Sequence, residues 1–172
     1  MMSHYECKEC QKPYQYCECK QENKMNELKR TKEWFEQAIP EPTMKDKRVQ
    51  IGCHFEEFGE MLDSIGYEKT PELEMITHEA DWFKGKKSHF TDQQEDMIIH
   101  CNKDALLDSL ADQMVTAIGV CHMMGFDIEG ALAEVNRSNF SKFEDGKPVF
   151  DANGKITKGK HYTPPELGDF IK

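Results

Sequence analysis

The sequence lacks several features that define whole classes of protein. No run of 18 apolar residues occurs in its 172 residues, which argues against a membrane-spanning helix. The first ten residues, MMSHYECKEC, contain no apolar segment of the kind that a secretory signal needs. Lys and Arg number 22 against 32 Asp and Glu, so the net charge of −10 makes nucleic acid an unfavourable partner. We expect a cytoplasmic protein that binds neither membranes nor nucleic acid directly.

Four of the seven cysteines are concentrated at the start of the chain. They follow the spacing CxxC, six residues, then CxC, and are Cys7, Cys10, Cys17 and Cys19. Without a secretory segment, we expect reduced thiols rather than disulfides. Four thiolates so close together can form a tetrahedral Zn²⁺ site, so residues 1–22 are predicted to form a small zinc-binding head. The alternative is a cysteine-bearing tail without order.

The remaining chain, residues 26–172, has the periodicity of an all-α domain. Prolines after residue 39, a Thr-Pro pair at 70–71 and glycines at 66 and 125 mark helix ends. After Phe143 the helical period disappears, and Asp-Gly and Asn-Gly pairs predict a hairpin or an ordered tail. Helices are predicted over residues 25–39, 46–66, 70–86, 102–125 and 127–143.

Two of these helices carry stripes of acidic side chains beside apolar ones. Asp104, Asp108 and Asp112 recur every fourth residue and therefore share one side of a helix. The apolar neighbours on that side predict a stripe that borders the core; they are Leu107, Ala111, Val115 and Ile118. In the helix over 46–66, Glu57 and Glu60 share a face and Glu56 flanks it.

Facing stripes of this kind would be costly without a counter-ion. At 4 Å and an effective dielectric near 20, each like-charge pair costs about 4 kcal/mol. A domain has only about 5–15 kcal/mol of net stability. We therefore expect Mg²⁺ or Mn²⁺ between the helices, since these ions prefer carboxylate oxygens. The alternative is that the acids form an ordinary solvated surface.

Basic side chains gather near the end of this acidic chain. They are Lys142, Lys147, Lys155, Lys158 and Lys160, with Asn139 one turn before the first. A local group of ammonium ions beside an acidic site suits a polyphosphate that binds both metal and lysines. The alternative for each lysine is a role in solubility alone.

These motifs resemble the MazG-like all-α nucleoside triphosphate pyrophosphohydrolases. The acidic motif is EEFGE at residues 56–60 with DSLAD at 108–112. The sequences SNFSK, DGKP, GK, KG and PPEL, between residues 138 and 167, are similar to the phosphoribosyl-ATP pyrophosphohydrolase-like branch that is common in phages. The resemblance covers residues 45–167 and leaves out the cysteine-rich head.

The resemblance implies an antiparallel helical bundle that works as a dimer or tetramer. It also implies hydrolysis of a nucleoside triphosphate between its α and β phosphates. In a phage nucleotide pool within the host cytoplasm, we expect purine deoxynucleotides as substrates, although no residue pattern specifies the base or the sugar. By motif position, Glu57, Glu60, Asp108 and Asp112 would hold Mg²⁺ or Mn²⁺, and Glu56 and Glu57 would be catalytic. The implied substrate-binding residues are Asn139, Lys142, Lys155 and Lys158.

Three departures from the family pattern are visible. Ser109 stands where the second motif usually has an acid, so Asp108 is expected to take that role. A segment over residues 74–84 separates the two motifs, and Asn136 stands where many relatives carry His. These departures leave two alternatives open, a non-catalytic zinc-headed dimeric interaction module and a structural Ca²⁺- or Mg²⁺-binding bundle.

Overall fold

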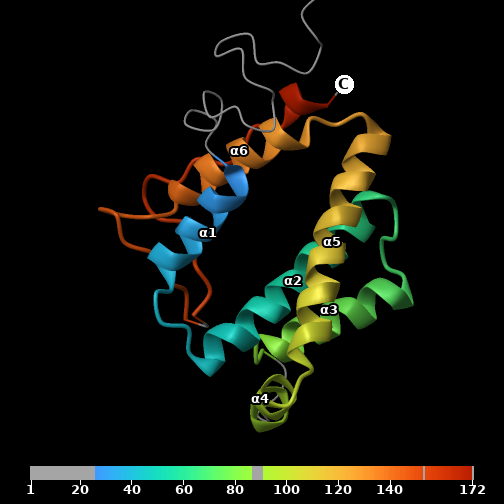
Figure 1. Cartoon of the computed structure of the whole chain (residues 1–172), viewed down its shortest axis with the longest axis vertical. Coiled ribbons are helices and arrows are strands. Elements are labelled where there is room, and N and C mark those ends of the chain that lie inside the picture. Colours follow the sequence, from blue (N-terminus) through green and yellow to red (C-terminus); the bar gives the residue numbers. More distant parts are fainter. Residues whose placement is uncertain (1–25, 87–90, 153, 172) are drawn as a thin grey trace, which may run out of the picture.

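The computed structural model describes residues 26–86, 91–152 and 154–171, and this part of the chain is helical (Figure 1). The all-α fold class predicted from the sequence is therefore confirmed for the described residues. The predicted zinc-binding head, with its four cysteines, lies outside them. The elements are α1 (Glu27–Ala38), α2 (Met44–Ser64), α3 (Pro71–Phe83), α4 (Thr91–Ile99), α5 (Lys103–Met124), α6 (Ile128–Phe140) and a 3₁₀ turn, η2 (Gly168–Phe170).

The helices begin where the sequence supplies a cap. At the start of five of them, a side-chain oxygen accepts hydrogen bonds from free backbone N–H groups, as helix N-termini require. The capping residues are Asn26, Thr43, Thr70, Asn102 and Asp127. The five predicted helices are confirmed, and each of their ends lies within three residues of the predicted position. Helix α4 was not predicted.

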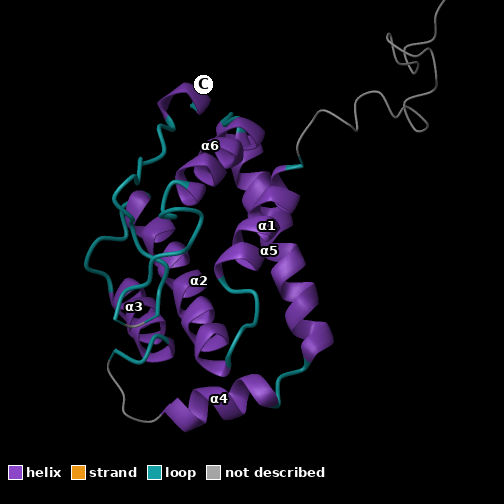
Figure 2. Cartoon of the chain, turned by 90° about the vertical axis from the view of Figure 1, so that its left-hand side faces the viewer, coloured by secondary structure: helices purple, strands orange, loops and turns teal. Residues whose placement is uncertain are grey.

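Two pairs of helices form the framework of the fold. Helices α2 and α3 pack against each other as a helical hairpin, and α1 packs against α6 (Figures 1 and 2). A Cβ atom at Gly52 would lie 2.7 Å from the carbonyl oxygen of Ala80 and 2.8 Å from Cγ of Lys84. Glycine is therefore needed here for α2 and α3 to approach so closely.

A buried amide joins α1 to α6. Asn136 of α6 is 1% exposed, and its Oδ1 accepts a hydrogen bond of 2.9 Å from the hydroxyl of Thr31. Its Nδ2 donates to the carbonyl oxygen of Glu27 at 3.0 Å and to the carboxylate of the same residue at 2.8 Å. Asn136, which stands where many MazG-like proteins carry His, therefore has a structural role, because its amide makes three hydrogen bonds to α1.

We expect Asn136→Ala to lower the free energy of unfolding by about 2–3 kcal/mol, because it removes the hydrogen bonds that a fully buried amide makes to α1 and leaves a cavity in its place. Urea unfolding followed by circular dichroism measures this loss. Gln93→Ala, which removes an exposed amide on α4, serves as the control and is expected to change stability by less than about 0.5 kcal/mol. Equal effects of the two substitutions would contradict the role given to Asn136.

Helix α5 stands largely outside this framework. None of its residues is buried, although it is 22 residues long. It touches α6 where the two helices join, and Gln113 forms a hydrogen bond with His54 of α2. The expectation that the apolar neighbours of its aspartates border the core is therefore wrong for the single chain, because no other element covers them.

Among the described residues, no single helix has the length and hydropathy to cross a membrane. Taken together, α5 and α6 meet those two criteria, but they are bent by 118° at their junction.

The chain after α6 returns along that helix as an ordered segment. It contains two isolated antiparallel bridges, Glu144 with Lys147 and Phe150 with Ile156, and the described residues form no strand ladder. Arg137 of α6 holds the segment by donating hydrogen bonds to Thr163 at 2.5 Å and to the carbonyl oxygen of Pro164 at 2.9 Å. This return places residues 154–156 against α2.

Candidate functional site

The end of α6 is fixed by an aromatic cluster on α1. The indole N–H of Trp34 donates a hydrogen bond of 2.9 Å to the carbonyl oxygen of Asn139, and the ring stacks on Phe143 at 5.9 Å between centroids. The ammonium group of Lys142 lies over the same ring, 5.7 Å from its centroid. Trp34 therefore places both Asn139 and Lys142, two of the predicted substrate-binding residues.

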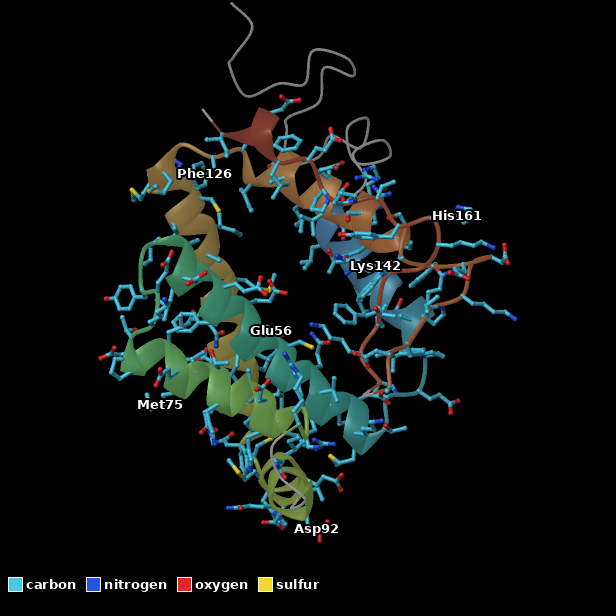
Figure 3. The ribbon with its side chains drawn as sticks, turned by 180° about the vertical axis from the view of Figure 1, so that it is seen from behind. Glu56, Met75, Asp92, Phe126, Lys142 and His161 are labelled. Atoms are coloured by element: carbon cyan, nitrogen blue, oxygen red, sulfur yellow. The ribbon has the colours of Figure 1, made fainter. Side chains whose placement is uncertain are left out.

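Lys155 reaches the same place from the C-terminal segment. A turn forms between Asp151 and Lys155, whose backbone N–H donates to the Asp151 carboxylate at 2.9 Å. The side chain then extends to α2, where its ammonium group donates to Oε2 of Glu56 at 2.6 Å. Glu56 and Lys142 lie on facing sides of the space between α2 and the α1–α6 pair (Figure 3). The turn therefore brings a second predicted lysine to the site.

Glu56 is held by two ammonium groups. Its Oε1 lies 2.6 Å from the ammonium nitrogen of Lys84, whose side chain is 3% exposed, and its Oε2 binds Lys155. Burial alone would raise the pKa of Glu56, but hydrogen bonds from Lys155 and Lys84 hold the pKa below its usual range. Burial would likewise lower the pKa of Lys155, and the bond to Glu56 raises it instead. Glu56 therefore links α2, α3 and the C-terminal segment as an ionised carboxylate.

These residues surround a small pocket between α1, α2, α6 and the C-terminal segment. Its volume is about 180 Å³. Four of its lining residues were predicted from the sequence, namely Glu57, Asn139, Lys142 and Lys155. Trp34, Phe35 and Ile39 of α1 provide apolar walls. We call this the lysine pocket.

The lysine pocket has charges of both signs, because Asp46 and Glu57 line it together with Lys142 and Lys155. Burial lowers the pKa of Lys142, and the nearby charges of Lys155 and Lys158 lower it further, while Glu57 acts in the opposite direction. Lys155 is already paired with Glu56, whereas Lys142 has no carboxylate partner among the described residues, so Lys142 is the ammonium group that an anionic ligand would neutralise. Cys53 also lines the pocket, and burial raises the pKa of its thiol. The thiol is therefore held in its neutral form beside the lysines.

Glu57 differs from Glu56 in its surroundings. It is exposed, lines the lysine pocket, and has no hydrogen bond or ion pair among the described residues. Its oxygens are therefore available to a ligand, whereas both oxygens of Glu56 are engaged.

The other predicted metal ligands do not converge on the lysine pocket. Glu60 lines a separate hollow between α2 and α3, and Asp108 and Asp112 are exposed on α5. Within the described ranges, no three His, Cys, Asp or Glu side chains are arranged to hold a metal ion. Lys158 lies with its ammonium group 4.9 Å from the ring centroid of Tyr162 and does not line the pocket. A single chain therefore brings together four of the predicted site residues and leaves the α5 acids apart.

Sequence reasoning missed two residues that organise the site. The sequence shows that Trp34 is one of two tryptophans and lies in a predicted helix. The periodicity of that helix does not indicate which other helix it packs against. Lys84 follows the last residue of α3, where a basic residue usually interacts with the free carbonyls at the helix end. No local pattern indicates that it instead turns inward to Glu56.

Lys84→Met is expected to lower the free energy of unfolding by about 2 kcal/mol, because it removes the buried partner of a carboxylate that retains only Lys155. Lys86→Met is the control, since its ion pair with Asp81 is on the surface and contributes less than about 1 kcal/mol. Urea unfolding at neutral pH compares the two.

The same comparison has an expected pH dependence. The folded-state pKa of Glu56 is depressed, so its contribution is complete above the usual carboxyl pKa of 4.5 and is lost as the pH falls through the lower folded value. The gap between wild type and Lys84→Met should therefore narrow below pH 4.5. A gap that is constant over that range would show that the ion pair does not cause it.

Comparisons with known proteins give no relative. A scan against protein-family models, a search of curated proteins and a search of solved structures each found no match. The functional argument therefore depends on the residues and their arrangement.

Proposed function

We propose that the protein is a Mg²⁺-dependent nucleoside triphosphate pyrophosphohydrolase that uses the lysine pocket. One observation carries the proposal: Glu57, Asn139, Lys142 and Lys155 come from α2, α6 and the C-terminal segment and line one pocket. The sequence resemblance had assigned these four residues, separated by up to 98 positions, to a single site. Two lysines, an amide and a carboxylate are the groups that phosphoryl transfer needs for positioning and charge compensation.

In the proposed reaction, water attacks the α phosphorus and the bond to the bridging oxygen breaks. The products are a nucleoside monophosphate, pyrophosphate and a proton. The ammonium groups of Lys142 and Lys155 would cancel charge on the phosphate oxygens, and the side-chain amide of Asn139 would donate a hydrogen bond to one of them. Purine deoxynucleotides in a phage nucleotide pool are the substrates that we expect.

The fit of Mg²⁺ to these residues follows from how this ion is bound. Mg²⁺ is usually held by one or two carboxylates together with substrate phosphates and water, so it does not need three protein ligands. Glu57 supplies a carboxylate at the pocket that no described residue engages, whereas Glu60, one turn further along α2, lines the separate hollow between α2 and α3. When bound, the ion would neutralise phosphate charge and lower the pKa of a coordinated water. Asp108 and Asp112 are proposed as further ligands only in an assembly that brings α5 closer.

A second copy of the chain is the proposed partner of α5. Helices of this kind gain most of their stability from packing of an apolar face, yet α5 has no buried residue. It exposes more large apolar side chains than the surface of a monomer usually carries. Such a surface suits an interface that buries about 800 Å² on each partner. The exposed large apolar residues of α5 are Leu106, Leu107, Leu110, Met114, Val115, Ile118, Val120, Met123 and Met124.

A substrate panel tests the enzymatic proposal. The canonical ribo- and deoxyribonucleoside triphosphates are incubated with the protein and Mg²⁺, and the products are separated by chromatography. We expect monophosphate and pyrophosphate from one or two of them, with at least a tenfold loss in Lys142→Met and no loss in the exposed Lys147→Met. Absence of turnover with both Mg²⁺ and Mn²⁺ would overturn the proposal and favour the zinc-headed interaction module.

A further inference from the structure

A second and larger pocket adjoins the lysine pocket. Its volume is about 620 Å³, and residues of α1, α2, α4 and α5 line it. It shares four lining residues with the lysine pocket, namely Phe35, Ile39, Asp46 and Gln50. The two pockets therefore adjoin each other along α1 and α2. We call the larger one the apolar pocket.

The two pockets differ in chemistry. The apolar pocket is bounded by Ile51 of α2, Ile98 of α4, and Leu106 and Leu110 of α5. Lys142 and Lys155 do not line it; Lys32 and Lys47 do, but most of its exposed lining is apolar. A triphosphate would lose much of its hydration there, whereas an aromatic ring would gain from leaving water.

Size gives a second reason to consider the pockets together. Pockets that enclose a ligand of drug size have volumes of roughly 300–1,000 Å³, and their walls are mostly apolar with a few polar groups. The lysine pocket, at about 180 Å³, is below this range, and the apolar pocket, at about 620 Å³, is within it. A ligand with a charged end and an aromatic end matches the pair better than it matches either pocket alone.

We propose that the apolar pocket binds the aromatic base of a nucleotide whose phosphates occupy the lysine pocket. This inference rests on the proposed function, which supplies the nucleotide as ligand class. The sugar would cross between the pockets beside Phe35 and Gln50. The amide of Gln50, which can both donate and accept hydrogen bonds, would then lie near the base and is suited to read its polar edge.

Calorimetry with two kinds of probe tests the proposal on the intact chain. Tripolyphosphate carries only the charged part of the ligand, and α,β-methylene analogues of the four canonical deoxynucleoside triphosphates carry both parts and resist cleavage. For the wild type, we expect at least one analogue to bind about tenfold or more tightly than tripolyphosphate. Equal affinity for tripolyphosphate and all four analogues would overturn the proposal, and this comparison requires no substitution.

Two adjacent residues of α4 provide a matched pair of variants. Ile98 lines the apolar pocket and is partly buried, whereas Ile99 is 57% exposed and does not line it. We expect Ile98→Ala to weaken the analogue about five- to tenfold and to leave tripolyphosphate binding unchanged. Ile99→Ala should change neither. Ile51→Ala, on α2, repeats the test if Ile98→Ala fails to fold by circular dichroism.

The outcomes also separate this inference from the proposed function. A base-dependent affinity without any hydrolysis would support the apolar pocket and contradict the enzyme. Hydrolysis with equal affinities for tripolyphosphate and the analogues would support the enzyme and contradict the role of the apolar pocket. If Ile98→Ala changed the sedimentation coefficient and not the analogue affinity, a second copy would be the occupant of the pocket, and the inference would be wrong.

Discussion

Replacing Glu57 with glutamine is expected to lower nucleoside triphosphate hydrolysis by a factor of about 10³ or more. Glu57 lines the lysine pocket, and neither of its oxygens has a hydrogen bond or ion pair with the part of the chain that the structure describes, so a neutral amide would remove the negative charge on which the proposed metal binding depends. Tripolyphosphate affinity without metal should stay the same or rise, because the substitution removes a negative charge from an anion site. Initial rates and calorimetry measure these two effects separately.

Glu68→Gln is the control for this substitution. Glu68 is exposed in the connection between α2 and α3, and the chemical change is identical. We expect the control to retain the wild-type rate and affinity. If Glu57→Gln also retained the wild-type rate, the assignment of the lysine pocket as the reaction centre would be wrong, whichever residues bind the phosphates.

Introducing charge on α5 is expected to separate the subunits. Val115 is 66% exposed and Ile118 is 52% exposed, and both lie on the apolar side of the helix. Burying two unpaired carboxylates at an interface costs several kcal/mol for each, so Val115→Asp with Ile118→Asp should raise the dissociation constant by a factor of about 10³ or more. Analytical ultracentrifugation over a range of concentrations measures the change.

Thr116→Asp is the control for the type of substitution, because it adds one aspartate to the polar side of the helix, between the two altered positions. Among the described residues, its hydroxyl bonds to two carbonyl groups of α5 itself, those of Asp112 and Gln113. The control should sediment as the wild type does. A wild-type protein that sediments as a monomer at all accessible concentrations would contradict the assignment of α5 as an interface between two copies.

Much of the helical framework could be predicted because its signals are local. Thr43 and Thr70 cap helices, and Gly125 ends one in the left-handed region with a φ of 78°. Helix α4 had no comparable signal, since its nine residues show no clear apolar period. Short helices depend on tertiary contacts, such as that of Gln94, which is fully buried and donates to the carbonyl oxygen of Trp82 at 3.1 Å.

The candidate site was predictable only where residue type and motif spacing carried the information. Asn139 and Lys142 lie one turn apart on the sequence, and the structure adds Lys155 and Glu57 to the same pocket. The burial of α5 was wrongly expected, because an apolar stripe indicates that a face will be covered but does not identify the covering surface. The inward turn of Lys84 depends on Gly52 and on the close approach of α2 and α3, which no local pattern specifies.

The most direct test of the central claim is ³¹P NMR of the wild-type protein with Mg²⁺ and the preferred deoxynucleoside triphosphate from the substrate panel. The account predicts that the three triphosphate resonances disappear together and are replaced by one monoester resonance and one pyrophosphate resonance. Formation of a nucleoside diphosphate and orthophosphate, or triphosphate resonances that persist with both Mg²⁺ and Mn²⁺ across the whole panel, would contradict it.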